Sequence, residues 1–378
     1  MAFFAGFCYT RFRDRSAYLY AAGIAVLLLT LLIGRQVRGT RAWLGGGMLG
    51  VQPSEFCKIT TILFLSAYLA RIGRSIRELR RFAVAFGIVM LPTALVLLQP
   101  DTGTAAVYLP IFLTMAFMTG ARVRHLVFIV VSASLAVFLS VLPAYEQHIL
   151  GRDLALLDFV TEPELLVYCV IALGVITGLA AWGAFGFRKS HFYWIMYASA
   201  ICLVGCLGAL AAAMTLKDYQ VMRLIVFLDP TIDPRASGWH TIQSTTAVGS
   251  GGLWGKGFLQ GTQSQYRFLP AQSTDFIFSV LSEEWGFAGG FLACLLLLVV
   301  LLRGVRITYC ARDEYGRYVG AGIVGMMCFH VFVNVGMALG IMPITGIPLF
   351  FLSYGGSSLW TGLIAVGLLL NIHLERRR

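Results

Sequence analysis

Long apolar runs separated by short polar segments dominate the pattern of this 378-residue chain. About ten of these runs approach the roughly 20 residues that an α-helix needs to cross a bilayer. They predict membrane-spanning helices at about 17–33, 56–70, 82–98, 104–120, 125–142, 165–186, 191–214, 286–303, 318–341 and 352–373. The second run is short and needs its flanking residues. The pattern therefore predicts an all-α polytopic membrane protein.

The longest polar connection, about 215–285, follows the seventh predicted span and is rich in Gly, Gln, Ser and Thr. Long loops often carry function. Within it, Lys217–Leu228 has the pattern of a short amphipathic helix, which could lie at a membrane surface. His240–Val248 is a second candidate for a short helix.

Composition supports the membrane class, because 58% of residues are hydrophobic and only 12% are charged. Soluble domains carry about a quarter charged residues. The net charge of +11 does not indicate nucleic-acid binding, since membrane proteins concentrate Lys and Arg in cytoplasmic loops. It permits anionic lipid headgroups or a phosphorylated lipid as partners. The eight cysteines are scattered, with no spacing typical of a zinc site or a disulfide framework.

The distribution of charge predicts an orientation with both termini in the cytoplasm. With the N-terminus inside, the inner segments carry most of the basic residues, namely Arg11, Arg13, Arg15, Arg71, Arg74, Arg77, Arg80, Arg81, Arg122, Arg124, Arg188, Lys189, Arg303, Arg306, Arg312, Arg317 and Arg376–Arg378. The outer segments include an acidic loop with Glu146, Asp153, Asp158, Glu162 and Glu164. The loop 215–285 is then extracytoplasmic.

One carboxylate stands where this outer loop meets an apolar helix, within Gln263–Phe287. Ser273 and Thr274 are predicted to cap a helix with Asp275 in its first turn, directly before Phe276–Phe278. A carboxylate beside so much apolar surface costs free energy unless it is paired or used in chemistry. The alternative is an aspartate stabilised only by the helix dipole.

Further polar groups fall on the same predicted face. Pro53 is typical of a first helical turn, and Glu55 and Lys58, three residues apart, can pair. They form either a structural ion pair or part of a cavity. Asp101 either caps the following helix or joins Glu55, Asp275, Glu283 and Glu284 as carboxylates that could converge at one polar site.

Two glycine-containing segments need separate interpretations. Gly249–Lys256 fails the spacing of a nucleotide-binding loop, because Ser250 and Gly257 stand where that loop needs Gly and Ser/Thr. A flexible turn is the better interpretation, with Lys256 able to meet a lipid phosphate. Gly346–Ser358 is an apolar segment broken by Gly and Pro, which membranes tolerate only inside protein or beside a water-filled cavity. The scattered histidines, His330 included, are interpreted as structural or interfacial.

Together these motifs resemble the SEDS family of bacterial membrane proteins. The matching segments are Arg41–Leu44, Gln52–Glu55, Gln99–Thr104, Tyr219–Gln220, Leu228–Pro230, Gln243–Ser244, Gly249–Gly261, Phe268–Pro270, Thr274–Phe278 and Asn334–Ser358. The similarity covers most of the chain except about 143–213. Gly261–Gln265 resembles the cell-elongation, RodA-like branch of the family.

The resemblance implies a peptidoglycan glycosyltransferase that polymerises lipid II into glycan strands at the outer face of the bacterial cytoplasmic (inner) membrane, during cell elongation and shape maintenance. It implies Asp275 as the essential residue and general base. Lys58, Arg223, Lys256 and Arg267 are the candidate cations for the leaving diphosphate, and Glu55 and Asp101 are candidate cavity residues. A class B penicillin-binding protein is the implied partner, and a divalent cation (Mg or Mn) often supports activity.

Two other functions remain open, a lipid II transporter (flippase) and a non-enzymatic scaffold of the wall-building complex. A transporter would spread its charges through the membrane depth, often between repeated halves, whereas here they gather on one predicted face. We expect a single SEDS-type domain over 1–378.

The chain departs from the family pattern at four places. Members usually begin with two further spans, and 143–213 resembles an inserted helix pair. Gln272-Ser273 replaces a basic or Ala-His pair, and Phe350 replaces a proline.

Overall fold

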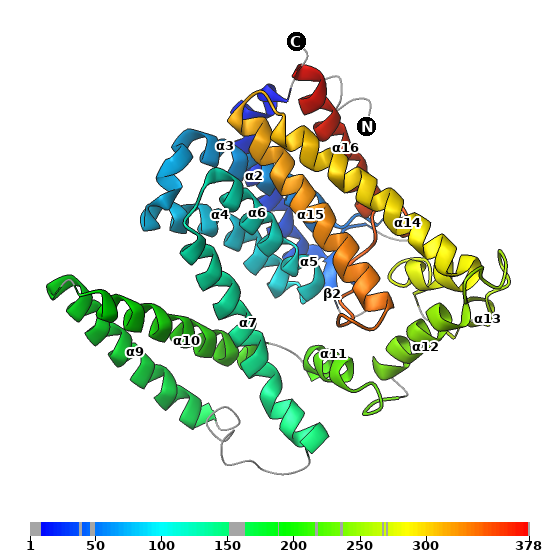
Figure 1. Cartoon of the computed structure of the whole chain (residues 1–378), viewed down its shortest axis with the longest axis horizontal. Helices are drawn as coiled ribbons and strands as arrows, with labels where there is room; N and C mark the ends of the chain where they lie inside the picture. The colour runs from blue at the N-terminus through cyan, green and yellow to red at the C-terminus, as the bar shows by residue number, and fades with distance from the viewer. Residues whose placement is uncertain are drawn as a thin grey trace. The chain divides into compact units, whose positions relative to one another are not determined.

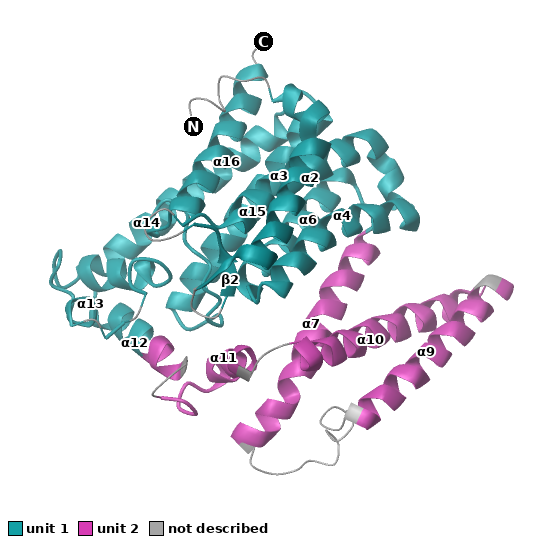
Figure 2. Ribbon diagram, turned by 180° about the vertical axis from the view of Figure 1, so that it is seen from behind, with its two compact units in different colours: residues 1–122, 243–378 teal, residues 123–242 magenta. Residues whose placement is uncertain are grey.

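The computed structural model describes residues 9–37, 40–45, 50–150, 163–187, 189–215, 218–234, 237–266, 268–269 and 271–376. They form two compact units, 1–122 with 243–378 and 123–242 (Figure 2). The elements of the first unit are α2 (Thr10–Ile33), β1 (Arg35–Val37), β2 (Thr40–Trp43), α3 (Pro53–Ile72), η2 (Gly73–Arg77), α4 (Leu79–Leu98), α5 (Thr102–Ala106), α6 (Tyr108–Thr119), α13 (Thr262–Gln265), α14 (Ile277–Tyr309), α15 (Glu314–Ala338) and α16 (Gly356–Glu375). The second unit holds α7 (Val123–Tyr145), η3 (Glu146–Leu150), α9 (Pro163–Gly186), α10 (Ser190–Thr215) and α11 (Asp218–Leu228), and α12 (Ser237–Ser250) begins there and ends in the first.

Ten helices of the described residues are long and apolar enough to cross a membrane, which confirms the predicted polytopic all-α class (Figure 1). The short second run extends into a full 20-residue helix, α3, because Pro53 opens it before the apolar stretch begins. α14 begins at Ile277 but is broken at Gly286, whose backbone is not helical (φ 66°, ψ −164°). The predicted apolar span starts at this break, and residues 277–285 form the short polar helix before it.

The polar connection 215–285 contains helices rather than open loop. The predicted amphipathic helix is α11, Asp218–Leu228, and the second short helix is α12. After α11 the Asp229 carboxylate accepts hydrogen bonds from the Thr231 hydroxyl at 2.6 Å and the Thr231 backbone N–H at 2.9 Å. These bonds lower the pKa of Asp229. The chain therefore turns sharply where the amphipathic pattern ends.

α15 forms the centre of the first unit, where it packs against α3, α6 and α14. Two-thirds of its membrane-crossing window (67%) is buried, the largest share among the described spans. Gly322 and Gly325 permit this packing, since a Cβ at either position would lie under 3 Å from a side chain of α3 or α6. A two-stranded antiparallel hairpin, β1–β2, connects α2 to α3. The sequence analysis did not predict that hairpin.

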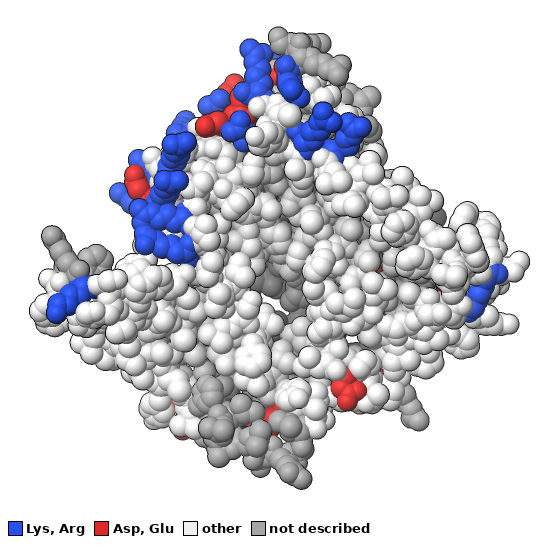
Figure 3. Space-filling view, in the orientation of Figure 1, with Lys and Arg blue, Asp and Glu red and all other residues white. Residues whose placement is uncertain are grey.

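Lys and Arg side chains gather over one end of the first unit, the end where the chain's two termini lie (Figures 1 and 3). α2 begins at this end, η2 lies there, and α16 finishes there. Gln52, Asp101 and Asp275 stand just before α3, α5 and α14, at the other end of this unit. The two ends of this unit thus differ in charge as the distribution along the sequence predicts.

The second unit is built on α7, α9 and α10 (Figure 2). Leu139, Leu166, Cys206 and Ala209 form a buried apolar cluster between these helices. The helix pair predicted within 143–213 corresponds to α9 and α10. Its interpretation as an insertion, and the single domain over 1–378, stay predictions. Asp153, Asp158 and Glu162 of the predicted acidic loop lie outside the described residues.

Candidate active site

Asp275 lies in a turn directly before α14, not in the first turn of that helix. Phe276 is the N-cap residue and makes no side-chain capping bond, so the predicted capping by Ser273 and Thr274 is wrong. The reason is Ala271, whose left-handed backbone (φ 53°) starts a turn before the helix. Its carbonyl accepts the backbone N–H groups of Thr274 (3.2 Å) and Asp275 (3.1 Å). The Asp275 side chain is half-buried.

The non-helical part of the predicted broken segment Gly346–Ser358, residues 346–355, lies against this turn. The amide nitrogen of Asn334, on α15, donates to the Asp275 carbonyl at 2.9 Å and to the Ile347 carbonyl at 2.8 Å. The backbone N–H of Tyr354 donates to the Ser273 carbonyl at 2.7 Å. Gly346 faces the carboxylate, since a Cβ there would lie 3.8 Å from Oδ2 of Asp275. Hydrogen bonds therefore connect this segment to the turn at Ser273 and, through Asn334, at Asp275, the candidate base.

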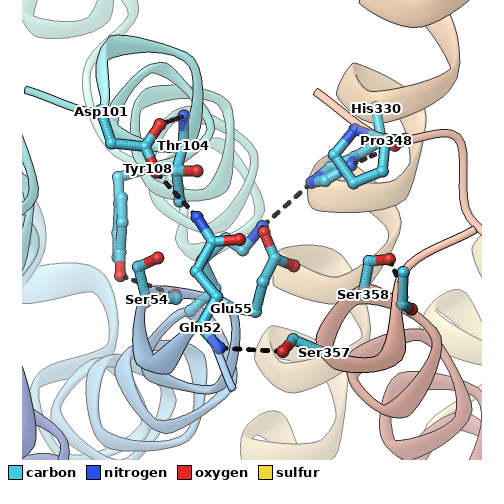
Figure 4. Close-up of polar contacts among 12 residues, drawn as sticks. Gln52, Ser54, Glu55, Asp101, Thr104, Tyr108, His330, Pro348, Ser357 and Ser358 are labelled. Atoms are coloured by element: carbon cyan, nitrogen blue, oxygen red, sulfur yellow. Dashed lines mark hydrogen bonds and ion pairs between the residues drawn. The ribbon is translucent and has the colours of Figure 1, made fainter. Parts of the chain in front are cut away.

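A buried ion pair lies at the start of α3. Lys58 Nζ is 2.8 Å from Glu55 Oε1, and the two side chains are 0% and 3% exposed. Lys58 Nζ is also 3.2 Å from Nε2 of His330, across the gap between α3 and α15 (Figure 4). The predicted pairing of Glu55 with Lys58 is confirmed. Such burial is favourable only with good geometry and further hydrogen bonds, which His330 supplies.

His330 connects this pair to the broken segment. Its Nδ1 lies 2.9 Å from the carbonyl of Pro348. Because a carbonyl can only accept, Nδ1 carries the proton and Nε2 accepts from the Lys58 ammonium. The His330 ring stacks on Phe350, with centroids 4.1 Å apart. Phe350, which replaces a proline of the family pattern, therefore packs on His330, which binds the Pro348 carbonyl of the segment.

Asp101 is held by two further contacts at the same end of the unit. It caps α5, accepting the Thr104 backbone N–H at 3.0 Å, as one of the two alternatives predicted. Its other oxygen accepts the Gln52 side-chain amide at 2.8 Å, and the Gln52 backbone N–H donates to Ser357 Oγ at 2.9 Å (Figure 4). Gln52 thus joins the starts of α3, α5 and α16.

Lys256 is occupied by protein groups. Its ammonium contacts Ser250 Oγ (2.7 Å), Thr262 Oγ (2.8 Å) and Glu283 Oε1 (2.9 Å), which uses the three donors of a lysine. Gln272, the other departure from the family pattern, donates to the Ser264 carbonyl at 2.9 Å. The Lys256 bond to Glu283 holds the polar loop to α14, and the Gln272 bond to Ser264 holds it close to the Asp275 turn.

The structure thus brings five of the predicted site residues into the first unit, namely Glu55, Lys58, Asp101, Lys256 and Asp275. Hydrogen bonds link Asp275 through Asn334, and Glu55 and Lys58 through His330, to the broken segment. Arg223 lies on α11 in the other unit, over the ring of Tyr219. Arg267 lies outside the described residues. Sequence reasoning missed Asn334 and assigned His330 no role beyond structure. Their spacing of four residues on one helix face was the available clue.

A divalent cation would need several carboxylate, histidine or cysteine ligands close together. No group of three such side chains occurs among the described residues. The described residues therefore supply no ligand cluster of their own for the divalent cation that the resemblance implies.

Comparison with known proteins identifies the family. A family model described as Cell cycle protein, FtsW/RodA/SpoVE, matches residues 1–172 and 165–378. The chain belongs to this family. FtsW/RodA/SpoVE members are the SEDS proteins that the sequence motifs resemble, so that recognition is confirmed.

Several relatives and solved structures support the assignment. The chain is 47% identical to the peptidoglycan glycosyltransferase RodA of Treponema pallidum, over 97% of this chain and 85% of the relative. It is 36% identical to stage V sporulation protein E of Bacillus subtilis, over 98% and 82%. A solved structure described as "Structural coordination of polymerization and crosslinking by a peptidoglycan synthase complex" is similar with a TM-score of 0.67 and 28% identity, covering 100% of this chain and 86% of the other.

Proposed function

We propose that this FtsW/RodA/SpoVE-family protein is a peptidoglycan glycosyltransferase that polymerises lipid II, with Asp275 as general base. The observation that carries the proposal is a half-buried carboxylate in a turn fixed from both sides, within a chain 47% identical to a relative named peptidoglycan glycosyltransferase. A partly exposed carboxylate can receive a proton from a substrate and return it to water.

The proposed step joins two lipid-linked sugars. Asp275 takes the proton of a sugar 4-hydroxyl, whose oxygen forms a bond to the anomeric carbon of the growing chain. The bond from that carbon to the diphosphate breaks, and undecaprenyl diphosphate leaves with the bonding electrons. General-base assistance of this kind accelerates reactions about 10²–10⁴-fold. The carboxylate must be ionised at the start of each cycle.

The diphosphate leaving group calls for cations. Lys58 and Lys256 already bind Glu55 and Glu283, so each would stabilise the diphosphate only by exchanging a partner. Arg223 and Arg267 remain the other candidates in this proposal. Glu55 and Asp101 are assigned to the cavity wall, where their contacts fix the starts of α3 and α5.

We place the Asp275 end of the first unit outside the bacterial inner membrane and both termini in the cytoplasm. The support is the cluster of Lys and Arg over the opposite end, since cytoplasmic loops carry an excess of these residues. The 215–285 segment is then extracytoplasmic. A class B penicillin-binding protein is the proposed partner, in line with the similarity to a complex that couples polymerisation to crosslinking.

The test is reconstitution of the purified protein and its partner with labelled lipid II, followed by separation of glycan strands by length. We expect long strands from the wild type and none from Asp275→Asn, which keeps the shape and removes the base. Asp313→Asn is the matched control. Asp313 is the N-cap residue of α15, at the other end of that helix from Asn334, so its replacement should leave polymerisation unchanged.

Three outcomes would contradict the proposal. Strands formed by Asp275→Asn at the wild-type rate would remove Asp275 from the chemistry. A wild type that moves labelled lipid II across vesicles without polymerising it would be a transporter. A wild type that does neither, but raises the partner's activity, would be a scaffold.

A further inference from the structure

We propose that Asn334 is a positioning residue for Asp275, acting together with His330 one turn earlier on α15. Both act on backbone carbonyls, Asn334 on that of Asp275 and His330 on that of Pro348. They hold the backbone that surrounds the Asp275 carboxylate. The inference rests on the proposed function, and it adds a role for a helix that carries none of the predicted site residues.

The Asn334 amide is suited to this role by its bonding capacity. Asn334 is fully buried, at 0% exposed, and its two N–H donors go to the carbonyls of Asp275 and Ile347. Both partners are acceptors, so the nitrogen must face them. Each of these carbonyls belongs to irregular backbone, where no helix or strand supplies a donor.

His330 holds the next carbonyl of the same segment. The Pro348 carbonyl accepts a hydrogen bond from His330 Nδ1, and the Ile347 carbonyl accepts one from the Asn334 amide. Two consecutive carbonyls therefore bind two residues that lie four apart on α15. Residues at this spacing lie on one helix face. Gly346, with φ 73°, turns the segment so that it passes the Asp275 carboxylate. The face of α15 therefore serves as the support on which the segment and the Asp275 turn are aligned.

Asp275 is fixed on both sides by this arrangement. Its own carbonyl is held by Asn334, and the carbonyl of Ser273 is held by the Tyr354 backbone N–H. Loss of the Asn334 donors would release the turn and the segment together. A displacement of about 1 Å can lower a rate by about 10²-fold. The loss should appear in kcat rather than KM, since the contact does not involve substrate.

The experiment compares Asn334→Asp with Asn371→Asp in the protein–partner complex supplied with labelled lipid II. Asn334→Asp keeps the size of the side chain but removes both donors. Asn371, on α16, is also buried, and its Oδ1 accepts the Tyr9 backbone N–H, a bond that an aspartate preserves. We expect Asn334→Asp to lower kcat by roughly 10- to 100-fold with KM changed less than about twofold, and Asn371→Asp to match the wild type.

Hydrogen exchange supplies a readout independent of activity. In Asn334→Asp the Tyr354 amide, bonded to Ser273, should exchange faster, together with the Leu349 amide, bonded to Ser353. Amides of α3 and α6 should keep their wild-type protection. Asn371→Asp should change none of these sites.

An unchanged kcat in Asn334→Asp would overturn the inference while leaving the proposed function intact. A lower kcat accompanied by faster exchange throughout α3 and α6 would also overturn it, because the residue would then act on the stability of the whole unit. A wild type that makes no strands would instead reject the proposed function. The local exchange at Tyr354 would then still decide whether Asn334 holds the segment.

Discussion

The ammonium of Lys256 lies 2.9 Å from Oε1 of Glu283, a carboxylate with 0% exposure on α14. The same carboxylate accepts the backbone N–H groups of Gln263 at 2.9 Å and Ser264 at 3.2 Å. One buried acid therefore holds a lysine and the first turn of α13. This side chain thus adds to the backbone hydrogen bonds that attach the polar loop to α14, such as that from the Lys256 N–H to the Glu283 carbonyl at 3.0 Å.

Replacing Glu283 with glutamine should loosen the loop. The change removes the charge that Lys256 and two backbone amides bind, and hydrogen bonds to charged groups contribute about 1.5–3 kcal/mol each. We expect a lower melting temperature of the purified protein and faster proteolysis within 250–266. Glu78→Gln is the control, since Glu78 pairs with Arg81 on the surface and such pairs contribute about 0–1 kcal/mol. Equal melting temperatures for the two variants would contradict the assignment.

The pair formed by Glu55 and Lys58 should behave as a coupled unit. Lys58→Met leaves a carboxylate buried without its cation, which costs about 3–5 kcal/mol. The double variant Glu55→Gln with Lys58→Met should recover most of that loss, because no unpaired charge remains. Unfolding in detergent, measured for both single variants and the double variant, gives the interaction free energy. Additive losses would show that the two side chains do not depend on each other.

Phe350→Ala should destabilise the broken segment. Phe350 is 1% exposed and stacks on His330, and truncation of a buried phenylalanine costs about 3–5 kcal/mol. The neighbouring Phe351 is 39% exposed, so Phe351→Ala should cost much less. Thermal unfolding of the two variants measures the difference. Similar melting temperatures would mean that the stacking on His330 contributes little.

Gly346→Ala tests whether the space in front of Asp275 is used. Gly346 and Gly340 share a φ of 73°, so alanine at either position should cost a similar amount, about 1 kcal/mol. Only at Gly346 would the new methyl lie 3.8 Å from Oδ2 of Asp275. We expect Gly346→Ala to reduce strand synthesis about tenfold or more, and Gly340→Ala to retain it. Equal activity of the two variants would place the substrate elsewhere.

The helices could be predicted from sequence because each span is a long apolar run, and the bilayer sets a minimum length. The predicted start of the eighth span, residue 286, coincides with the break in α14 at Gly286, and a short polar helix precedes this break. Glu283 and Glu284 lie inside α14, since their helix turn packs against the loop rather than facing lipid. The β1–β2 hairpin was missed because strands of three and four residues leave almost no periodic pattern.

Contacts of the site within one helix could be predicted from the sequence, and contacts between distant segments could not. Glu55 and Lys58 are neighbours on one helix, so their contact follows from spacing alone. The contacts of Asn334 with Asp275 and Ile347 join residues 59 and 13 positions apart. Irregular backbone has no periodicity from which such a bond can be deduced. The left-handed Ala271, which moved Asp275 out of the helix, gave no warning, because alanine rarely adopts that conformation.

The position of Lys58 three residues after Glu55 has a consequence for the biogenesis of the protein. A lone charge raises the free energy of inserting a membrane helix, by about 2.5–3.5 kcal/mol at the helix centre and by less near its ends, where Glu55 and Lys58 lie. Because the two charges lie on one helix face, they can neutralise each other as soon as α3 is helical. His330 belongs to α15, more than 270 residues later in the chain, and joins them only afterwards. The first turns of α3 can thus enter the bilayer without net charge, and the third polar partner of the pair arrives near the end of synthesis.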